Sequence, residues 1–194
     1  MKMVSKNTKK VMHFLLRSLE PININQLSRK LKISVGGSFK ILNKLEKEKL
    51  ILCNKIGNAK YYKIDLDNKE AFALSELILL ENKRKLKEYS KLYAEEIVKF
   101  NKADLIILFG SVLNKKDFND VDVLFVTSKI KAVTEFCLKI SRIKTKPVVP
   151  LIIREEDLIK KLKKKNKVII EVFNSGVVLH GERFFLEVLK NVER

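Results

Sequence analysis

Two short apolar segments separated by a polar spacer constrain the fold of this chain most. Residues 105–111 read Leu-Ile-Ile-Leu-Phe-Gly-Ser, and residues 120–126 read Asp-Val-Asp-Val-Leu-Phe-Val. Apolar runs of this length, bounded by turn residues, are typical of buried strands. Because successive side chains of a strand point to opposite faces, Asp120 and Asp122 are expected to project the same way. The sequence therefore predicts one strand that ends in Gly-Ser and a second that opens with two carboxylates.

The predicted carboxylate pair indicates a cation site. Two carboxylates that converge beside an apolar sheet are unfavourable unless a positive charge lies between them. Mg²⁺ takes oxygen ligands and bridges to phosphates. Gly110 allows a sharp turn and a close approach to a ligand, and Ser111 offers a hydroxyl and an N–H near a possible helix start. Asp-x-Asp alone is also common in solvated turns, but its occurrence with the apolar strands and the Gly-Ser turn favours a ligand site.

Gly-Ser after an apolar strand, a spacer, and then Asp-x-Asp among apolar residues resembles the DNA-polymerase-beta-like nucleotidyltransferase superfamily. Its minimal nucleotidyltransferases are the closest match, over about residues 86–181. The resemblance implies that Gly110 and Ser111 hold the phosphates of a nucleoside triphosphate, with ATP expected. It also implies that Asp120 and Asp122 are catalytic and bind Mg²⁺ or Mn²⁺. In the spacer, Lys115 and Lys116 are candidates for neutralising the leaving group.

One departure from that family concerns a third carboxylate, which active members carry on a later strand. Here the corresponding segment, residues 147–153, reads Pro-Val-Val-Pro-Leu-Ile-Ile and contains no acid. Glu155, Glu156 and Asp157 follow, but acids in the first turn of a helix are explained by the helix dipole. Without a third ligand, the second metal of a two-metal mechanism is poorly held. A transferase and a domain that only binds nucleotide therefore both remain open.

The charge of the chain favours an anionic partner. Formal net charge is +18 and the isoelectric point is near 9.8. Residues 1–66 hold 15 lysines and arginines against 4 acids, a surplus of 11. Such a surplus attracts nucleic acid, nucleotides or acidic proteins. Abundant lysine also suits a thermophilic or AT-rich source, such as an archaeon. The concentration of charge in the first third nevertheless favours nucleic-acid binding there.

The same first third predicts three helices and a hairpin. Pro21 ends the first helix, Asn25 is expected to cap the second, and Ser34 the third. Two apolar runs about Gly57-Asn58, residues 50–55 and 60–64, predict the hairpin. The residues expected to be buried lie at helical spacing: Val11, Phe14, Leu15 and Leu19 in the first helix, Leu27 and Leu31 in the second, and Val35, Phe39, Leu42 and Leu45 in the third.

This order of elements resembles the winged helix-turn-helix family over about residues 8–66. In that family the third helix enters the major groove of double-stranded DNA and the wing touches phosphates. The resemblance places the DNA-binding candidates on these two elements: Ser34, Gly36, Gly37, Ser38, Lys40, Asn43, Lys44, Lys47, Lys55, Lys60 and Lys63. The third helix has no Arg or Gln for direct base readout, so sequence choice is expected to depend on DNA shape or dimer spacing. Winged helices also serve as protein-interaction modules, which stays an alternative.

The rest of the chain predicts an α+β protein: residues 1–66 as the winged helix, 67–85 as a helical connector, and 86–194 as a small nucleotidyltransferase-like α/β domain with a mixed sheet. Helical patterns run through residues 70–100, with Tyr89 and Tyr93 expected in the core. Further expected elements are a helix over 133–143, a strand over 148–153, a long lysine-rich helix carrying Leu158, Leu162, Ile169 and Val172, a strand over 177–179 and a helix over 182–192.

Cysteine use and hydropathy suggest a cytoplasmic protein. Cys53 and Cys137 lie far apart in apolar surroundings and predict neither a disulfide framework nor a zinc site. No apolar run reaches the length of a membrane span, and the basic start leads into an amphipathic helix rather than a secretion signal. Three functions follow as hypotheses. These are a DNA-binding nucleotidyltransferase, a regulator whose second domain senses nucleotide, and an antitoxin that represses its promoter and contacts a toxin. A homodimer is compatible with each.

Overall fold

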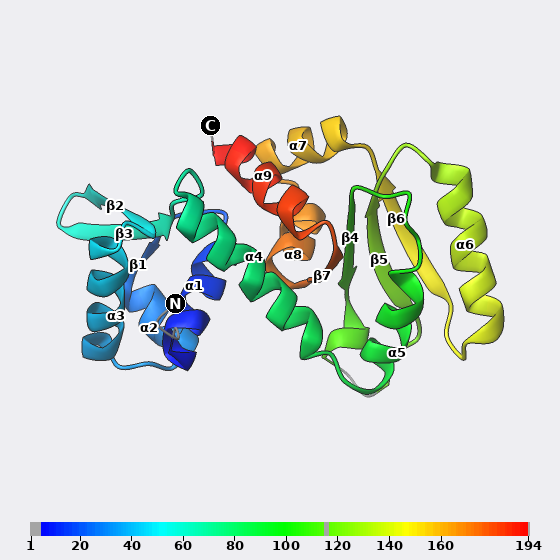
Figure 1. The fold of residues 1–194 in the computed structure, drawn as a ribbon, viewed down its shortest axis with the longest axis horizontal. Coiled ribbons are helices and arrows are strands. Elements are labelled where there is room, and N and C mark those ends of the chain that lie inside the picture. Colours follow the sequence, from blue (N-terminus) through cyan, green and yellow to red (C-terminus); the bar gives the residue numbers. More distant parts are fainter. Residues whose placement is uncertain (1–4, 115–116, 194) are drawn as a thin grey trace. The chain divides into compact units, whose positions relative to one another are not determined.

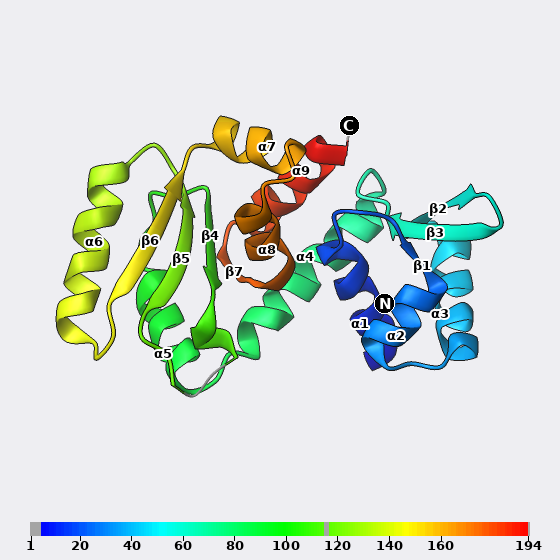
Figure 2. The ribbon, with the colours of Figure 1, turned by 180° about the vertical axis from the view of Figure 1, so that it is seen from behind.

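The computed structural model describes residues 5–114 and 117–193 (Figures 1 and 2). The protein is α+β, with one antiparallel sheet and one mixed sheet, as the sequence predicts. The chain divides into two compact units, Met1–Ile78 and Leu79–Arg194. The border between them falls within helix α4, Lys69–Arg84.

The first unit combines three helices and the first part of α4 with a small sheet. Strand β3 lies in the middle of the sheet and pairs antiparallel with β1 on one side and β2 on the other. Strands β2 and β3 form the predicted hairpin, whose turn uses Gly57 at φ +58°. The elements that precede α4 are α1 (Lys6–Arg17), β1 (Ile22–Asn23), α2 (Ile24–Leu31), α3 (Val35–Lys47), β2 (Ile51–Ile56) and β3 (Ala59–Ile64).

Side-chain caps fix where the helices of this unit begin. The Ser34 side chain accepts a hydrogen bond from the Gly37 N–H, which confirms Ser34 as the cap of α3. The expected cap at Asn25 was wrong: α2 begins two residues earlier. Asn23 accepts from the Gln26 N–H, and the Gln26 side chain accepts from the Asn23 N–H in return. This reciprocal pair satisfies two amide donors that a single cap at Asn25 leaves open.

The buried face of α3 differs from the prediction. Leu42 and Leu45 are buried as expected, but Val35 and Phe39 are 51% and 50% exposed. Ser38 is fully buried instead, and its hydroxyl is 2.9 Å from the Ser28 hydroxyl of α2. Positions 38, 42 and 45 follow the i, i+4, i+7 spacing of one helical face, so that face, rather than the one that carries Phe39, packs on the unit.

The second unit is built on a four-stranded sheet in the order β6-β5-β4-β7. Strand β4 pairs antiparallel with β5 and β7, whereas β5 and β6 are parallel. Its elements after α4 are α5 (Glu88–Ile97), β4 (Leu105–Phe109), η1 (Ser111–Leu113), β5 (Val121–Val126), α6 (Ile130–Ile143), β6 (Val148–Ile153), α7 (Glu155–Lys163), α8 (Lys167–Ser175), β7 (Val177–His180) and α9 (Glu182–Glu193).

Both faces of the central strands are buried, which explains their continuous apolar sequences. Helices α5 and α6 cover one face and α8 and α9 the other (Figures 1 and 2). On the α5 side, the rings of Phe100 and Phe125 meet edge to face with centroids 5.6 Å apart. Tyr93 is 1% exposed, as expected, and its hydroxyl donates to the Lys146 carbonyl over 2.9 Å. The core position expected for Tyr89 was wrong, because half of that residue is exposed.

The long helix expected across residues 158–172 is also a wrong prediction, because the segment forms two helices, α7 and α8. Lys165 adopts a left-handed conformation at φ +52°, and the Asn166 side chain caps α8 by accepting from the Ile169 N–H. Asparagine competes well for an N-cap, so it starts a new helix where the apolar spacing alone predicts continuation. No helix among the described residues has the length and apolar character of a membrane span.

Candidate nucleotide-binding and nucleic-acid-binding sites

The turn that follows β4 lies directly against the carboxylate of Asp122. Phe109 and Asp122 are Cα partners in the β4–β5 ladder, which brings the next residue, Gly110, beside Asp122. Gly110 has φ +81°, and a Cβ added there would lie 2.2 Å from the Asp122 Oδ2 atom. Two properties therefore require glycine at this position: the backbone conformation and the close approach of the carboxylate. The structure brings together the predicted turn and the second predicted acid.

The two predicted acids lie close enough to influence each other. Asp120 immediately precedes β5, and Asp122 is its second residue. Burial raises the pKa of Asp122 above its ordinary value, and the negative charge of Asp120 raises it further. The ionised pair is therefore unfavourable as it stands, and a cation between the carboxylates would relieve the repulsion.

Ser111 opens η1, a short 3-10 helix, and is half-buried. The helix start expected here is only three residues long, with the Leu113 N–H bonded to the Gly110 carbonyl. The contribution of Ser111 to a site therefore rests on its hydroxyl and its backbone, rather than on a helix dipole. Lys115 and Lys116, the spacer lysines predicted to neutralise a leaving group, lie outside the described residues.

The strand register identifies what stands in the place of a third acid. Strand β6 runs parallel to β5, and Val149 is the Cα partner of Asp122. Phe109, Asp122 and Val149 thus form one row across three strands, and Val149 is 45% exposed. Within residues 5–114 and 117–193, no group of three or more His, Cys, Asp or Glu side chains is placed to hold a metal ion.

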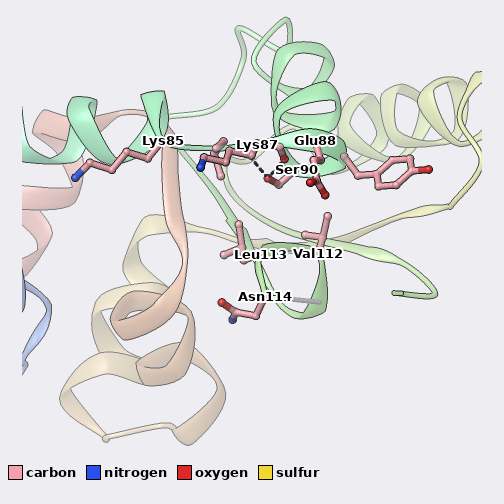
Figure 3. Close-up of a pocket in the computed structure, with 9 residues that line it drawn as sticks. Lys85, Lys87, Glu88, Ser90, Val112, Leu113 and Asn114 are labelled. Carbon is pink, nitrogen blue, oxygen red and sulfur yellow. Dashed lines mark hydrogen bonds between the residues drawn. The ribbon is translucent and has the colours of Figure 1, made fainter. Parts of the chain in front are cut away.

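A pocket beside η1 contains residues that the sequence reasoning missed. It has a volume of about 310 Å³, and Figure 3 shows Lys85 and Lys87 on one side and Val112, Leu113 and Asn114 on the other. The Ser90 hydroxyl holds the start of α5 by donating to the Lys87 carbonyl over 2.6 Å. The remaining residues that line the pocket are Leu86, Glu88 and Tyr89. The only sequence signal for this pocket was the pair of lysines at the junction of two helical patterns.

Most DNA-binding candidates of the first unit lie on the exposed surface of α3 and the hairpin. Lys40, Lys44 and Lys47 are exposed, and Asn43 is partly exposed. Ser38 is a wrong candidate, since it is fully buried against Ser28. DNA contact by the remaining candidates stays a prediction. These are Ser34, Gly36 and Gly37 at the start of α3, and Lys55, Lys60 and Lys63 on the hairpin.

The glycines at the start of α3 have different environments. A Cβ on Gly36 would meet no atom within 4 Å, whereas one on Gly37 would lie 3.0 Å from the Ser34 hydroxyl. Gly37 is therefore explained by the cap itself. Gly36 has no such internal reason and leaves the backbone open to a ligand.

The hairpin places two lysines directly opposite each other. Lys55 and Lys60 are Cα partners, both are exposed, and like charges in that position are unfavourable. Glu46 lies 4.0 Å from the Lys60 ammonium, an exposed ion pair of small energetic value. An external anion bound between Lys55 and Lys60 would relieve the repulsion that remains between the two lysines.

Comparisons with known proteins do not define a family. No protein-family model matches the chain, and no curated protein matches it. A structure of a Lactococcus lactis ZitR variant is 16% identical, covers 50% of this chain and 73% of the ZitR chain, and has a TM-score of 0.31. A similarity of this size carries no argument about fold or function.

We expect Asp122→Asn to raise the free energy of unfolding at pH 7. A carboxyl whose pKa is higher in the folded state disfavours folding once it ionises. That cost is absent below the ordinary aspartate pKa, grows as the pH rises through the higher folded value, and is complete above it. Urea denaturation at pH 3 and pH 7 measures the difference between the proteins. Glu135→Gln, on the exposed surface of α6, is the control, and equal stability of Asp122→Asn and wild type at pH 7 contradicts the electrostatic account.

Proposed function

We propose that this chain is a DNA-binding regulator whose second unit binds a nucleoside triphosphate together with a divalent cation. The observation that carries the nucleotide part is the close approach of Gly110 to the Asp122 carboxylate, whose pKa is raised by burial and by the charge of Asp120. A glycine turn next to two neighbouring carboxylates suits a cation that bridges to phosphate. The resemblance to minimal nucleotidyltransferases supports the same assignment.

The donor set fits Mg²⁺ or Mn²⁺ of a nucleotide complex. Mg²⁺ is commonly held by one or two carboxylates, with phosphate oxygens and waters as its other ligands. Asp120 and Asp122 would supply the carboxylates, and Gly110 and Ser111 would approach the phosphates with backbone and hydroxyl groups. The bound cation would neutralise both carboxylates and the adjacent phosphate charge.

We further propose that the wild-type unit binds nucleotide without transferring it. Catalysis of transfer to a hydroxyl requires the acceptor oxygen to be activated, a task that a third carboxylate and its metal support. Val149 occupies the position next to Asp122 and has no oxygen ligand. The alternative, an active nucleotidyltransferase, retains the support of Gly-Ser and Asp-x-Asp, and turnover distinguishes the two.

The DNA-binding part of the proposal rests on unit 1. A helix with exposed lysines and an open glycine at its start is followed by a hairpin that carries two opposed lysines. The charge surplus of residues 1–66 gives this unit the electrostatic character of a polyanion-binding module. The resemblance to winged helices supports α3 as the element that enters the major groove.

Nucleotide binding is tested on the full chain with ATP and MgCl₂ or MnCl₂. At a ligand concentration about 100 times Kd, binding should stabilise the wild-type protein by about 2.7 kcal/mol. Gly110→Ala should lose this effect because its Cβ would meet the Asp122 carboxylate. Asp122→Asn, which keeps the turn intact, should lose it too. Gly36→Ala is the matched control, as its Cβ meets no atom within 4 Å. Unchanged stability of the wild-type protein with both cations contradicts the assignment.

Turnover is tested with ATP labelled on the α-phosphate. Wild-type protein should bind ATP and transfer no label to itself or to added protein and nucleic-acid acceptors. Val149→Asp should bind the Mn²⁺ complex more tightly than wild type, because it places a third carboxylate beside Asp122. Val168→Asp, at an exposed position of α8, controls for added negative charge. Label transfer by wild-type protein that disappears in Asp122→Asn supports the transferase instead.

DNA binding is tested by measuring affinity for duplex DNA over a range of salt concentrations. Lys40→Ala with Lys44→Ala should weaken binding and make the slope of log K against log salt shallower by about 2, roughly one unit per phosphate contact. Lys160→Ala with Lys164→Ala removes equal charge at equal spacing from α7 and its C-cap, and should leave the slope unchanged. If both double variants behave alike, net charge rather than α3 governs the binding.

A further inference from the structure

The surface of α3 combines exposed lysines with an exposed aromatic ring. Phe39 is 50% exposed and lines a shallow hollow with Lys40, Asn43, Lys44, Lys47 and Glu48. Val35, one turn earlier, is 51% exposed. Because residues four apart lie on the same helical face, Val35, Phe39 and Asn43 form one row along the helix.

Val35 and Phe39 together form a small exposed apolar patch on α3, which is available to a partner. The core does not use Phe39, since the buried face of α3 is formed by Ser38, Leu42 and Leu45. The lysines around the ring disfavour a second copy of this strongly basic unit and favour a polyanion. The occupant must therefore present negative charge around the ring and an apolar group opposite it.

We propose that Phe39 reads thymine through its methyl group in the major groove, an inference that rests on the proposed DNA binding by α3. In that groove thymine presents its C5-methyl group, and phenylalanine is among the side chains that contact it. The lysines on the same face lie where they can reach phosphates on either side. This readout supplies base selection in a helix that carries no Arg or Gln.

Asn43 extends the same row by one turn. An asparagine amide can bond both the N7 and the N6 groups of adenine in the major groove. A helix rises 1.5 Å per residue, so Phe39 and Asn43 are about 6 Å apart along the axis of α3. The pair selects duplexes in which a thymine and an adenine lie close together, and Val35 adds a second apolar contact at the start of the helix.

The test uses the full chain and duplexes selected from a randomised pool. The preferred sequence is then made with thymine or with uracil, which lacks only the methyl group. Wild-type protein should bind the uracil duplex about fourfold more weakly for each contacted thymine, the effect of one buried methyl group. Phe39→Ala should bind the two duplexes equally. Leu52→Ala, an exposed apolar residue of β2, should retain the wild-type preference.

Three results overturn the inference while leaving DNA binding in place. The first is a selected pool without any sequence preference. The second is equal binding of the thymine and uracil duplexes by wild-type protein. The third is a Phe39→Ala variant that still distinguishes the two duplexes, which would assign the preference to DNA shape. Far-ultraviolet circular dichroism checks that Phe39→Ala is folded, and Phe39→Leu, which keeps an apolar contact, should retain part of the preference. Absence of binding to any duplex at low salt contradicts the proposed DNA binding itself.

Discussion

The approach of Gly110 to the Asp122 carboxylate is the contact on which the second unit's candidate site depends. It results from the pairing of Phe109 with Asp122, so strand register, turn and acid are fixed together. A one-residue slip in that pairing would move every side chain of β5 to the opposite face of the sheet. Any side chain at position 110 would displace the carboxylate, since its Cβ would lie 2.2 Å from Oδ2. The relative positions of Gly110 and Asp122 are therefore set by the pairing of two strands.

The same register limits what this site can do. In the parallel β5–β6 pair, Val149 lies beside Asp122, where a third carboxylate would complete a metal-binding set. Two acids suffice to hold a cation that shares its ligands with phosphate, whereas a second metal needs more oxygen donors. The number of carboxylates thus distinguishes a site that binds a nucleotide from one that also transfers part of it. Under the proposed function, the basic first unit recognises DNA and the second unit binds the nucleotide to which the regulator responds.

Within the first unit, two buried serines occupy positions on α2 and α3 where apolar residues would be expected. The Ser28–Ser38 hydrogen bond lets a polar residue occupy the core face of α3, because the buried hydroxyls satisfy each other. With Ser38, Leu42 and Leu45 buried, Phe39 faces solvent among lysines. An apolar residue that hydropathy assigns to the core thus becomes available for recognition, and a serine that polarity assigns to the surface becomes structural.

The sequence by itself determined much of the local structure. The strands that surround Gly110 and Asp122, the Ser34 cap and the β2–β3 hairpin all follow from apolar runs, turn residues and caps, which act over a few neighbouring positions. Tertiary packing decided which helical face is buried, that Val149 stands beside Asp122, and that Lys85 and Lys87 line a pocket with η1. These features join segments distant in the chain, and their free energy comes from contacts that no local pattern encodes. Periodicity places Phe39 on a helix, but the packing of Ser38, Leu42 and Leu45 on the rest of the unit turns it outward.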